Sequence, residues 1–198
     1  MATEIREPKQ KRSIETKRKI IDASYALFSE VGYYNTNTAE IAKRAGVSTG
    51  IVYGYFKDKR DILLEVLELY TDNAYRPILE LFDKFSAPDF DVLVPEILES
   101  AIAVHKKYAK IHEALHSMTH VDEEVNAKFI ALEDTITIKF SSRLNVLGYD
   151  CDGLLEKIHL SMNLVQSFAH EYIYDKHTYI DYDKMYRFVC ESIINLFK

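Results

Sequence analysis

Residues 38–59, which read TAEIAKRAGVSTGIVYGYFKDK, constrain the fold of this chain more than any other stretch. Two short helical patterns flank a tight turn. Gly46 interrupts the first pattern, at a place where a positive φ costs glycine little. Thr38 and Ser48 stand at the starts of the two patterns, where hydroxyl side chains can cap helices. On the buried side we expect Ile41, Ala42, Ala45, Ile51 and Val52, with Val47 as an apolar plug in the turn.

Caps, breaker and apolar spacing fall at compatible distances in this stretch. Together they predict a helix-turn-helix, a motif whose second helix enters the major groove of DNA. The alternative is an ordinary corner between two helices, which needs the same caps and breaker but has no DNA-reading role.

The charge of the chain is unevenly distributed. The 198 residues carry a net charge of −6, which by itself argues against DNA. Residues 1–60, however, contain 12 Lys and Arg against 7 Asp and Glu, a net charge of +5. Residues 61–198 contain 13 basic and 24 acidic residues, a net charge of −11. A basic segment attached to an acidic body can still bind phosphate.

Helical periodicity continues on both sides of the motif, and neither a hairpin signal nor a repeat is evident. The sequence therefore predicts an all-α chain of about nine helices, the first three of them small. Besides the two motif helices, we expect helices over 13–31 (ended by Gly32), 58–76 (ended by Pro77), 95–107, 109–118, 122–148, 152–174 and 181–197.

Several function classes lack their signals. The sequence contains no run of about 18 apolar residues, so we do not expect a membrane span. The charged N-terminus does not resemble a secretory signal. Cys151 and Cys190 are the only cysteines, and we expect free thiols in a cytoplasmic protein. Without a Gly-rich phosphate loop, a nucleophile elbow or a spaced carboxylate pair, we do not expect an enzyme.

Composition divides the chain into three parts. Residues 1–12 include Arg6, Lys9, Lys11 and Arg12 and almost no apolar side chain, which predicts a mobile basic arm, the alternative being a solvated tail without a role. Residues 13–60 form the expected DNA-binding domain, and residues 61–198 form a helical body.

The last two helical segments are apolar on more than one side, so each needs more than one neighbour. They are either an interior pair or a dimer interface. We favour the interface, because helix-turn-helix proteins commonly read paired half-sites with two-fold symmetry. The interface residues expected are Leu155, Met162, Val165, Phe168, Phe188 and Ile193.

Residues 20–64 carry a family resemblance. They include Ile20–Ala23, Leu27-Phe28, Gly32-Tyr33, Thr38, Ile41-Ala42, Ala45–Ser48, Gly50, Tyr53, Tyr55-Phe56, Lys59 and Leu63-Leu64. In these positions the chain resembles the TetR family of bacterial transcriptional regulators. Beyond residue 64 the match is one of length, helix count and layout only.

The resemblance implies an all-α homodimer. Three N-terminal helices bind double-stranded DNA, and a C-terminal helical domain binds a small-molecule effector and dimerises. It also implies that Thr38 holds a phosphate at the start of its helix, and that Lys59 does so at the start of the fourth helix. The other DNA-contacting positions implied are Ser48, Thr49, Gly50, Tyr53 and Tyr55.

The recognition helix departs from the family pattern at one position. Gly54 stands where a larger aromatic or polar residue often sits, which removes a possible base contact. Either Tyr53 or Tyr55 is alternatively a core residue, whereas the spacing makes Phe56 core.

The effector cavity implied by the family should be lined by some of the aromatic side chains of the body, together with histidines that can hydrogen-bond a ligand. The residues expected are Tyr70, Tyr108, His112, His116, Phe129, Phe140, Phe168 and Tyr172. The histidine repeat at 112, 116 and 120, with His105 nearby, also raises a metal site as an alternative. We favour no metal and no cofactor.

The sequence thus predicts a ligand-responsive DNA-binding regulator. The reading we favour is a homodimeric repressor released from a pseudo-palindromic operator by a small, largely hydrophobic effector. The alternative is an adaptor or co-activator of the same fold that acts through a protein partner.

Overall fold

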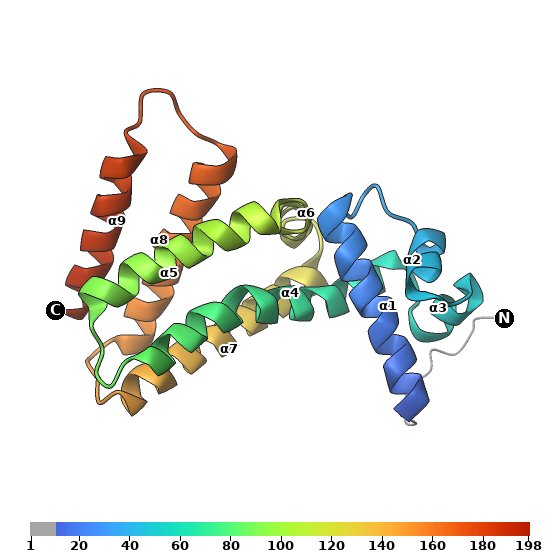
Figure 1. Cartoon of the computed structure of the whole chain (residues 1–198), viewed down its shortest axis with the longest axis horizontal. Helices are drawn as coiled ribbons and strands as arrows, with labels where there is room; N and C mark the ends of the chain where they lie inside the picture. The colour runs from blue at the N-terminus through green and yellow to red at the C-terminus, as the bar shows by residue number, and fades with distance from the viewer. Residues whose placement is uncertain (1–10) are drawn as a thin grey trace. The chain divides into compact units, whose positions relative to one another are not determined.

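The computed structural model describes residues 11–198. Within this range every regular element is a helix and there is no strand, which confirms the all-α class. The expected basic arm lies mostly at residues 1–10, outside the described residues, whereas Lys11 and Arg12 are the first residues of a helix. The helices are α1 (Lys11–Glu30), α2 (Thr38–Ala45), α3 (Thr49–Tyr55), α4 (Lys59–Leu81), the short 3-10 helix η1 (Phe82–Lys84), α5 (Phe90–Lys107), α6 (Ala109–Thr119), α7 (Glu123–Val146), α8 (Leu154–Tyr174) and α9 (Tyr182–Phe197) (Figure 1).

The helices form two compact units. The first unit contains the described residues up to Asp72 together with Tyr108–Ile130, and the second contains Asn73–Lys107 together with Ala131–Lys198. The division falls inside α4 and inside α7, so each of these helices contributes to both units.

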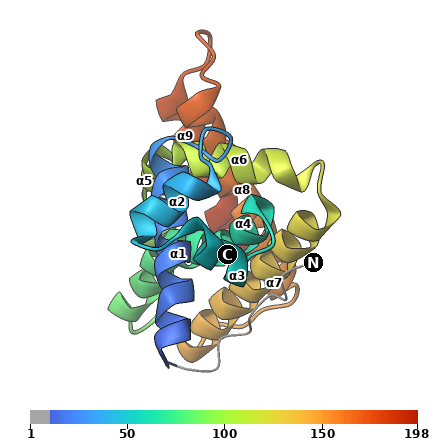
Figure 2. The same cartoon turned by 90° about the vertical axis from the view of Figure 1, so that its right-hand side faces the viewer.

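In the first unit, α1 packs against α2 and α6, and α2 packs against α3. Figure 2 turns α2 and α3 toward the viewer. Long apolar side chains are fully enclosed between these short helices, since burial is what stabilises helices too short to persist alone. The largest of them are Phe28, Phe56, Ile20, Ile41, Ile62, Leu63, Leu67, Ile111 and Leu115.

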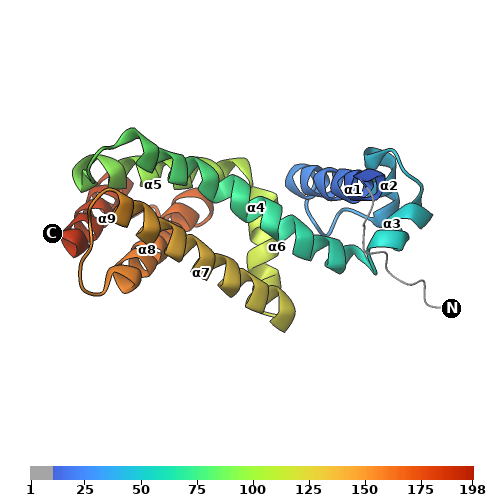
Figure 3. The same ribbon diagram turned by 90° about the horizontal axis from the view of Figure 1, so that it is seen from below.

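In the second unit, α5 packs against both α8 and α9, and α8 packs against α9 (Figure 3). Apolar side chains from every helix of the unit meet between them. The best buried include Leu93, Leu98, Ile136, Leu144, Phe168, Ala169 and Ile193.

Both helix boundaries expected at prolines were wrong. α4 continues through Pro77 to Leu81, and α5 begins at Phe90 with Pro95 inside it. In each case burial outweighs the hydrogen bond that proline removes. Ile78 beyond the first proline and Leu93 before the second are at most 5% exposed, which holds the flanking turns in helical form.

Candidate nucleic-acid interface and effector cavity

α2 is capped by a residue that the sequence analysis overlooked. Asn37, not Thr38, is the N-cap: its side-chain oxygen accepts hydrogen bonds from the backbone N–H of Ala39 and of Glu40, each at 3.0 Å. The Glu40 carboxylate accepts the Asn37 backbone N–H at 3.0 Å, completing a capping box. Asn37 followed three residues later by Glu40 was the available signal. Thr38 is the first residue of the helix.

The turn and the second cap follow the expectation. Gly46 adopts φ 69°, and its N–H reaches back to carbonyls of α2. Ser48 caps α3 by accepting the N–H of Ile51. Val52 is fully buried, but Ile51, expected inside, is 42% exposed. One face of α3 therefore points outward, as a groove-reading helix requires.

Two hydroxyl groups on the surface lie within hydrogen-bonding distance of each other. Both were expected from the sequence to bind DNA. Thr38 Oγ1 and the Tyr53 hydroxyl are 3.0 Å apart, and the Tyr53 side chain is 45% exposed. The pair joins the start of α2 to α3. Each hydroxyl keeps capacity for a further hydrogen bond, so the pair can address a phosphate jointly.

Tyr55 lies elsewhere. It is 9% exposed, and its hydroxyl is 2.9 Å from Ser13 Oγ, so this ring belongs to the packing of α3 against α1. Phe56 is 1% exposed, which confirms it as a core residue.

Lys59 anchors the loop between α1 and α2. Its ammonium donates to the backbone carbonyls of Tyr33 and Thr36, each at 2.7 Å, and lies 4.2 Å from the centre of the Tyr33 ring. Burial lowers the pKa of this amine. Two of its three hydrogens are thus committed to the loop, and one remains to reach a phosphate.

Ion pairs within the first unit occupy other basic side chains. Arg44 binds Glu30 through both of its terminal nitrogens, at 2.9 and 2.6 Å. Arg60 binds Asp122 through two nitrogens and Glu124 at 2.7 Å. Because Asp122 and Glu124 lie beyond residue 60, the net charge of residues 1–60 overstates what is available to DNA. Exposed positive side chains include Lys43 in α2 and Lys57 just after α3.

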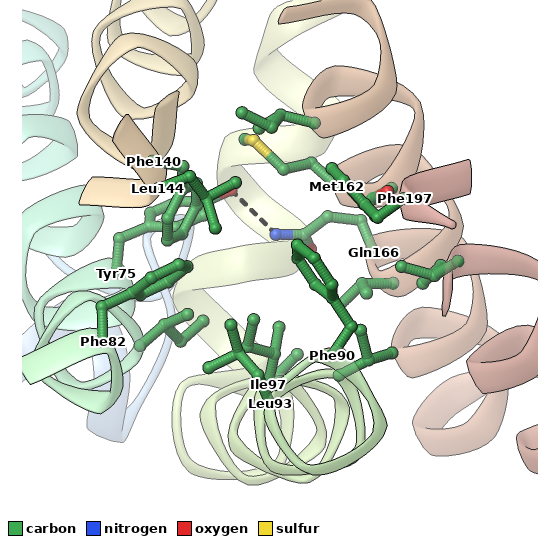
Figure 4. Close-up of a pocket in the computed structure, with 17 residues that line it drawn as sticks. Tyr75, Phe82, Phe90, Leu93, Ile97, Phe140, Leu144, Met162, Gln166 and Phe197 are labelled. Carbon is green, nitrogen blue, oxygen red and sulfur yellow. Dashed lines mark hydrogen bonds between the residues drawn. The ribbon is translucent and has the colours of Figure 1, made fainter. Parts of the chain in front are cut away.

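The second unit encloses an apolar cavity of about 80 Å³ (Figure 4). Five aromatic rings and several aliphatic side chains form its walls. They come from α4, η1, α5, α7, α8 and α9: Tyr75, Ile78, Phe82, Phe90, Leu93, Val94, Ile97, Ala101, Phe140, Leu144, Ile158, Ser161, Met162, Val165, Gln166, Ile193 and Phe197.

One polar pair and the Ser161 hydroxyl interrupt these walls. The Gln166 side-chain amide donates to the Tyr75 hydroxyl at 2.9 Å (Figure 4). Burial raises the pKa of Tyr75 to about 12, so the phenol is neutral. Gln166 was not among the expected effector residues; a glutamine between Val165 and Phe168 on an otherwise apolar helix face was the signal.

The structure distributes the expected effector residues over three places. Phe140 lines the cavity. Phe168 is 1% exposed and stacks on Tyr172, which lines an open groove beside α9. The others cluster in the first unit, where the Tyr70 hydroxyl is 2.6 Å from His112 Nδ1 and successive rings are in contact: Tyr70, Tyr108, His112, His116 and Phe129.

The expected dimer residues also divide. Met162, Val165 and Ile193 line the cavity, and Phe168 is core. Leu155 and Phe188, in contrast, are 47% and 63% exposed. Of the six residues, these two have an apolar surface that a second copy can cover.

Among residues 11–198, no three or more His, Cys, Asp or Glu side chains gather as metal ligands do. His105 instead directs Nδ1 to the Ala101 carbonyl at 2.8 Å. In the same range, none of the helices combines the length and apolarity that crossing a bilayer requires.

A capped helix-turn-helix with an outward, hydroxyl-bearing second helix places the chain among helix-turn-helix proteins. Residues 20–66 match the family of bacterial regulatory proteins called tetR. The transcriptional regulator AcrR of Shigella flexneri is 35% identical over 112 residues, covering 55% of this chain and 52% of AcrR. Residues 20–66 thus belong to the TetR family of bacterial regulatory proteins.

Solved structures share the fold of more than nine-tenths of the chain. A protein described as a TetR-family regulator from Mesorhizobium loti has a TM-score of 0.74 at 19% identity, covering 94% of this chain and 97% of that one. A transcriptional regulator from Saccharomonospora viridis, solved with choline, has a TM-score of 0.68 at 16% identity, covering 91% and 96%.

The sequence matches cover a smaller part of the proteins than the structural matches do. The chain spans about half the length of the curated relatives that it matches first. Those relatives are named as transcriptional regulators, in agreement with the expectation that the chain is not an enzyme.

Proposed function

We propose that this protein is a homodimeric transcriptional repressor, bound to a pseudo-palindromic operator and released by a small hydrophobic effector. Residues 13–60 bind DNA, and residues 61–198 hold the effector and dimerise. Action in the cytoplasm, with double-stranded DNA as the partner, belongs to the same proposal. The observation that carries it is the exposed Thr38–Tyr53 hydroxyl pair on a capped helix-turn-helix within the segment that matches the family.

The DNA interface has two parts. Ser48, Thr49 and Gly50 form the leading end of α3, where small residues allow close approach to base edges. Thr38, Tyr53 and the remaining hydrogen of Lys59 address phosphates, which fixes the register of α3 without reading sequence. Tyr55 is left out because it is buried.

The effector site is the apolar cavity of the second unit. A ligand can release DNA only by binding the non-binding conformation more tightly than the DNA-binding one. A coupling of about 1–3 kcal/mol changes operator affinity about 5- to 150-fold. The choline complex of the Saccharomonospora viridis protein supports ligand binding in this fold.

Dimerisation is assigned to the outer faces of α8 and α9. Leu155, Leu160 and Phe188 expose apolar surface there, between 47% and 63% of each side chain. A second copy that covers this face would present two recognition helices about 34–36 Å apart, one turn of DNA.

The experiment that tests the proposal compares DNA affinities of matched variants. Thr38→Val and Tyr53→Phe each remove one hydroxyl and keep the shape. We expect each to weaken binding to the protein's own upstream region by about tenfold, since a hydrogen bond contributes about 1 kcal/mol or somewhat more. Tyr179→Phe, at an exposed position of the second unit, is the control and should change nothing.

The wild-type protein must also prefer that region over random DNA, with an affinity that falls steeply with salt. Equal affinity for random DNA would contradict the proposal. An adaptor function is the second candidate, favoured by Gly54, which leaves one position in the last turn of α3 without a side chain. Stoichiometric capture of one protein partner together with absent DNA preference would establish it.

A further inference from the structure

The cavity of the second unit specifies the chemistry of its ligand. Among the described residues, those that line it include no Asp, Glu, Lys, Arg or His. A buried charge without a partner is far more costly than a buried apolar group. Glu133 is close enough to contribute to the raised pKa of Tyr75, but it does not line the cavity. The ligand is therefore expected to be uncharged.

Aromatic rings bound the cavity from different sides (Figure 4). Phe140 lies 6.5 Å from Tyr75 and 5.5 Å from Phe82, measured between ring centres. Across the cavity, Phe90 and Phe197 stack at 4.7 Å. Flat rings pack favourably at such distances, edge to face or offset, and a rigid ring loses little freedom on binding.

The polar pair supplies one directed hydrogen bond. Tyr75 accepts from Gln166, so its own hydroxyl hydrogen is left to donate to a ligand. The Gln166 amide nitrogen thus fixes the position of the Tyr75 oxygen, which preorganises the Tyr75 hydroxyl. The amide oxygen of Gln166 is buried without a hydrogen-bond partner in the described part of the chain.

We infer that the cavity binds a small uncharged aromatic molecule carrying one hydrogen-bond-accepting oxygen, a hydroxyl or carbonyl, which the Tyr75–Gln166 pair recognises. This inference rests on the proposed effector site. A cavity of about 80 Å³ is smaller than the roughly 150 Å³ that holds benzene in an engineered cavity, so the walls must move to admit a ring. Met162, long and unbranched, is a wall residue suited to that movement.

The test uses four probes built on one ring: p-cresol, toluene, 4-methylbenzoate and 4-methylphenyltrimethylammonium. Binding to the full chain is measured without DNA, by calorimetry and ligand-observed NMR. We expect p-cresol to bind about 5- to 10-fold more tightly than toluene, the effect of one hydrogen bond. The anion and the cation should bind at least about 100-fold more weakly than p-cresol.

Variants of the polar pair locate the recognition. Tyr75→Phe and Gln166→Leu should bring the affinity for p-cresol down to that for toluene, while toluene binding persists and shows that the cavity is intact. Ser142→Ala, on α7 outside the cavity, is the matched control, because the Ser142 hydroxyl already donates to the Ile138 carbonyl at 2.8 Å. It should leave all affinities unchanged.

Several results would overturn the inference. They are equal or tighter binding of either ion, tighter binding of 1-hexanol than of p-cresol, a preference for p-cresol that survives both variants, and absence of binding by any ring probe. DNA binding is measured separately, so these results leave the repressor proposal standing. Conversely, p-cresol that binds as expected but does not weaken operator binding contradicts only the effector role of the cavity.

Discussion

The helix-turn-helix and the apolar cavity are built in opposite ways. In the first, the determining contacts are local: Asn37, Gly46 and Ser48 each bond backbone groups within a few residues. In the second, the wall residues run from Tyr75 to Phe197 and come from six helical elements. A locally determined motif can be recognised in sequence and shared across a family, whereas a dispersed cavity can change its ligand by single substitutions.

The largest difference in DNA binding should appear when one phenylalanine is replaced by alanine in the helix-turn-helix and one in the cavity wall. Phe56→Ala is expected to destabilise the chain by about 3–5 kcal/mol and to abolish DNA binding, because this ring is 1% exposed in the core beneath α3. Thermal unfolding and a gel-shift measure both effects.

Phe140→Ala is the matched variant in the cavity wall. At temperatures where it is folded, it should bind DNA like the wild type and respond differently to ligand. Loss of DNA affinity in folded Phe140→Ala as complete as in Phe56→Ala would break the comparison.

Removing the cap of α2 tests how far local contacts stabilise the helix-turn-helix. Asn37→Ala should cost about 1 kcal/mol in the free energy of unfolding, since two N–H groups of α2 lose their acceptor. Chemical denaturation gives the value. Asn37→Ser retains a capping oxygen and should stay close to the wild type; an equal loss in both variants would show that the cap is not the cause.

Replacing each of two glycines by alanine should change the stability of the chain in opposite directions. Gly54→Ala places a methyl group in open space on α3 and should stabilise the chain by up to about 1 kcal/mol, with little change in DNA affinity. Gly46→Ala meets no atom either, but its φ of 69° should make it destabilising by about 1–2 kcal/mol. Melting temperatures of the two variants decide; shifts of the same sign would contradict the backbone argument.

The smallest expected effect concerns acid stability. Arg60 holds the pKa of Asp122 at about 2, below the usual value of about 3.9. The unfolded chain therefore binds a proton that the folded chain does not, and stability falls as pH drops from about 4 through 2. Asp122→Asn should flatten this part of the stability profile.

Arg60→Ala provides the second side of that cycle. It removes the same pair and should flatten the same pH range, and the double variant should add little to either single variant. A profile in which the two single variants are additive would mean that another pair holds Asp122.

These contrasts explain what the sequence could predict. Short-range signals placed the helix-turn-helix, the cap at Ser48 and the core position of Phe56, because each depends on neighbours in the chain. The burial of Tyr55 depends on Ser13, 42 residues away, and no local pattern reveals it. For the same reason the residues that line the cavity were predicted from aromatic content alone. Of the eight expected residues, only Phe140 lines it.

Long-range pairing also decided the charges. Arg60 and Asp122 are 62 residues apart, so counting basic residues over 1–60 did not show that this arginine is already neutralised. The sequence did not resolve the environment of the apolar side chains of α8 and α9. Periodicity shows which side chains share a helix face, but not whether one of them lines the cavity, as Met162 does, or is exposed to solvent, as Phe188 is.

Pro77 gives α4 a mechanical property that its helical course conceals. Proline has no amide hydrogen, so the carbonyl of Asn73 receives no bond from position 77. Asn73 is also the first residue of the second unit, immediately after Asp72 ends the first segment of the other. The helix shared by both units thus has reduced bending stiffness where they divide. A bend of α4 at this point breaks one hydrogen bond fewer than a bend elsewhere in the helix.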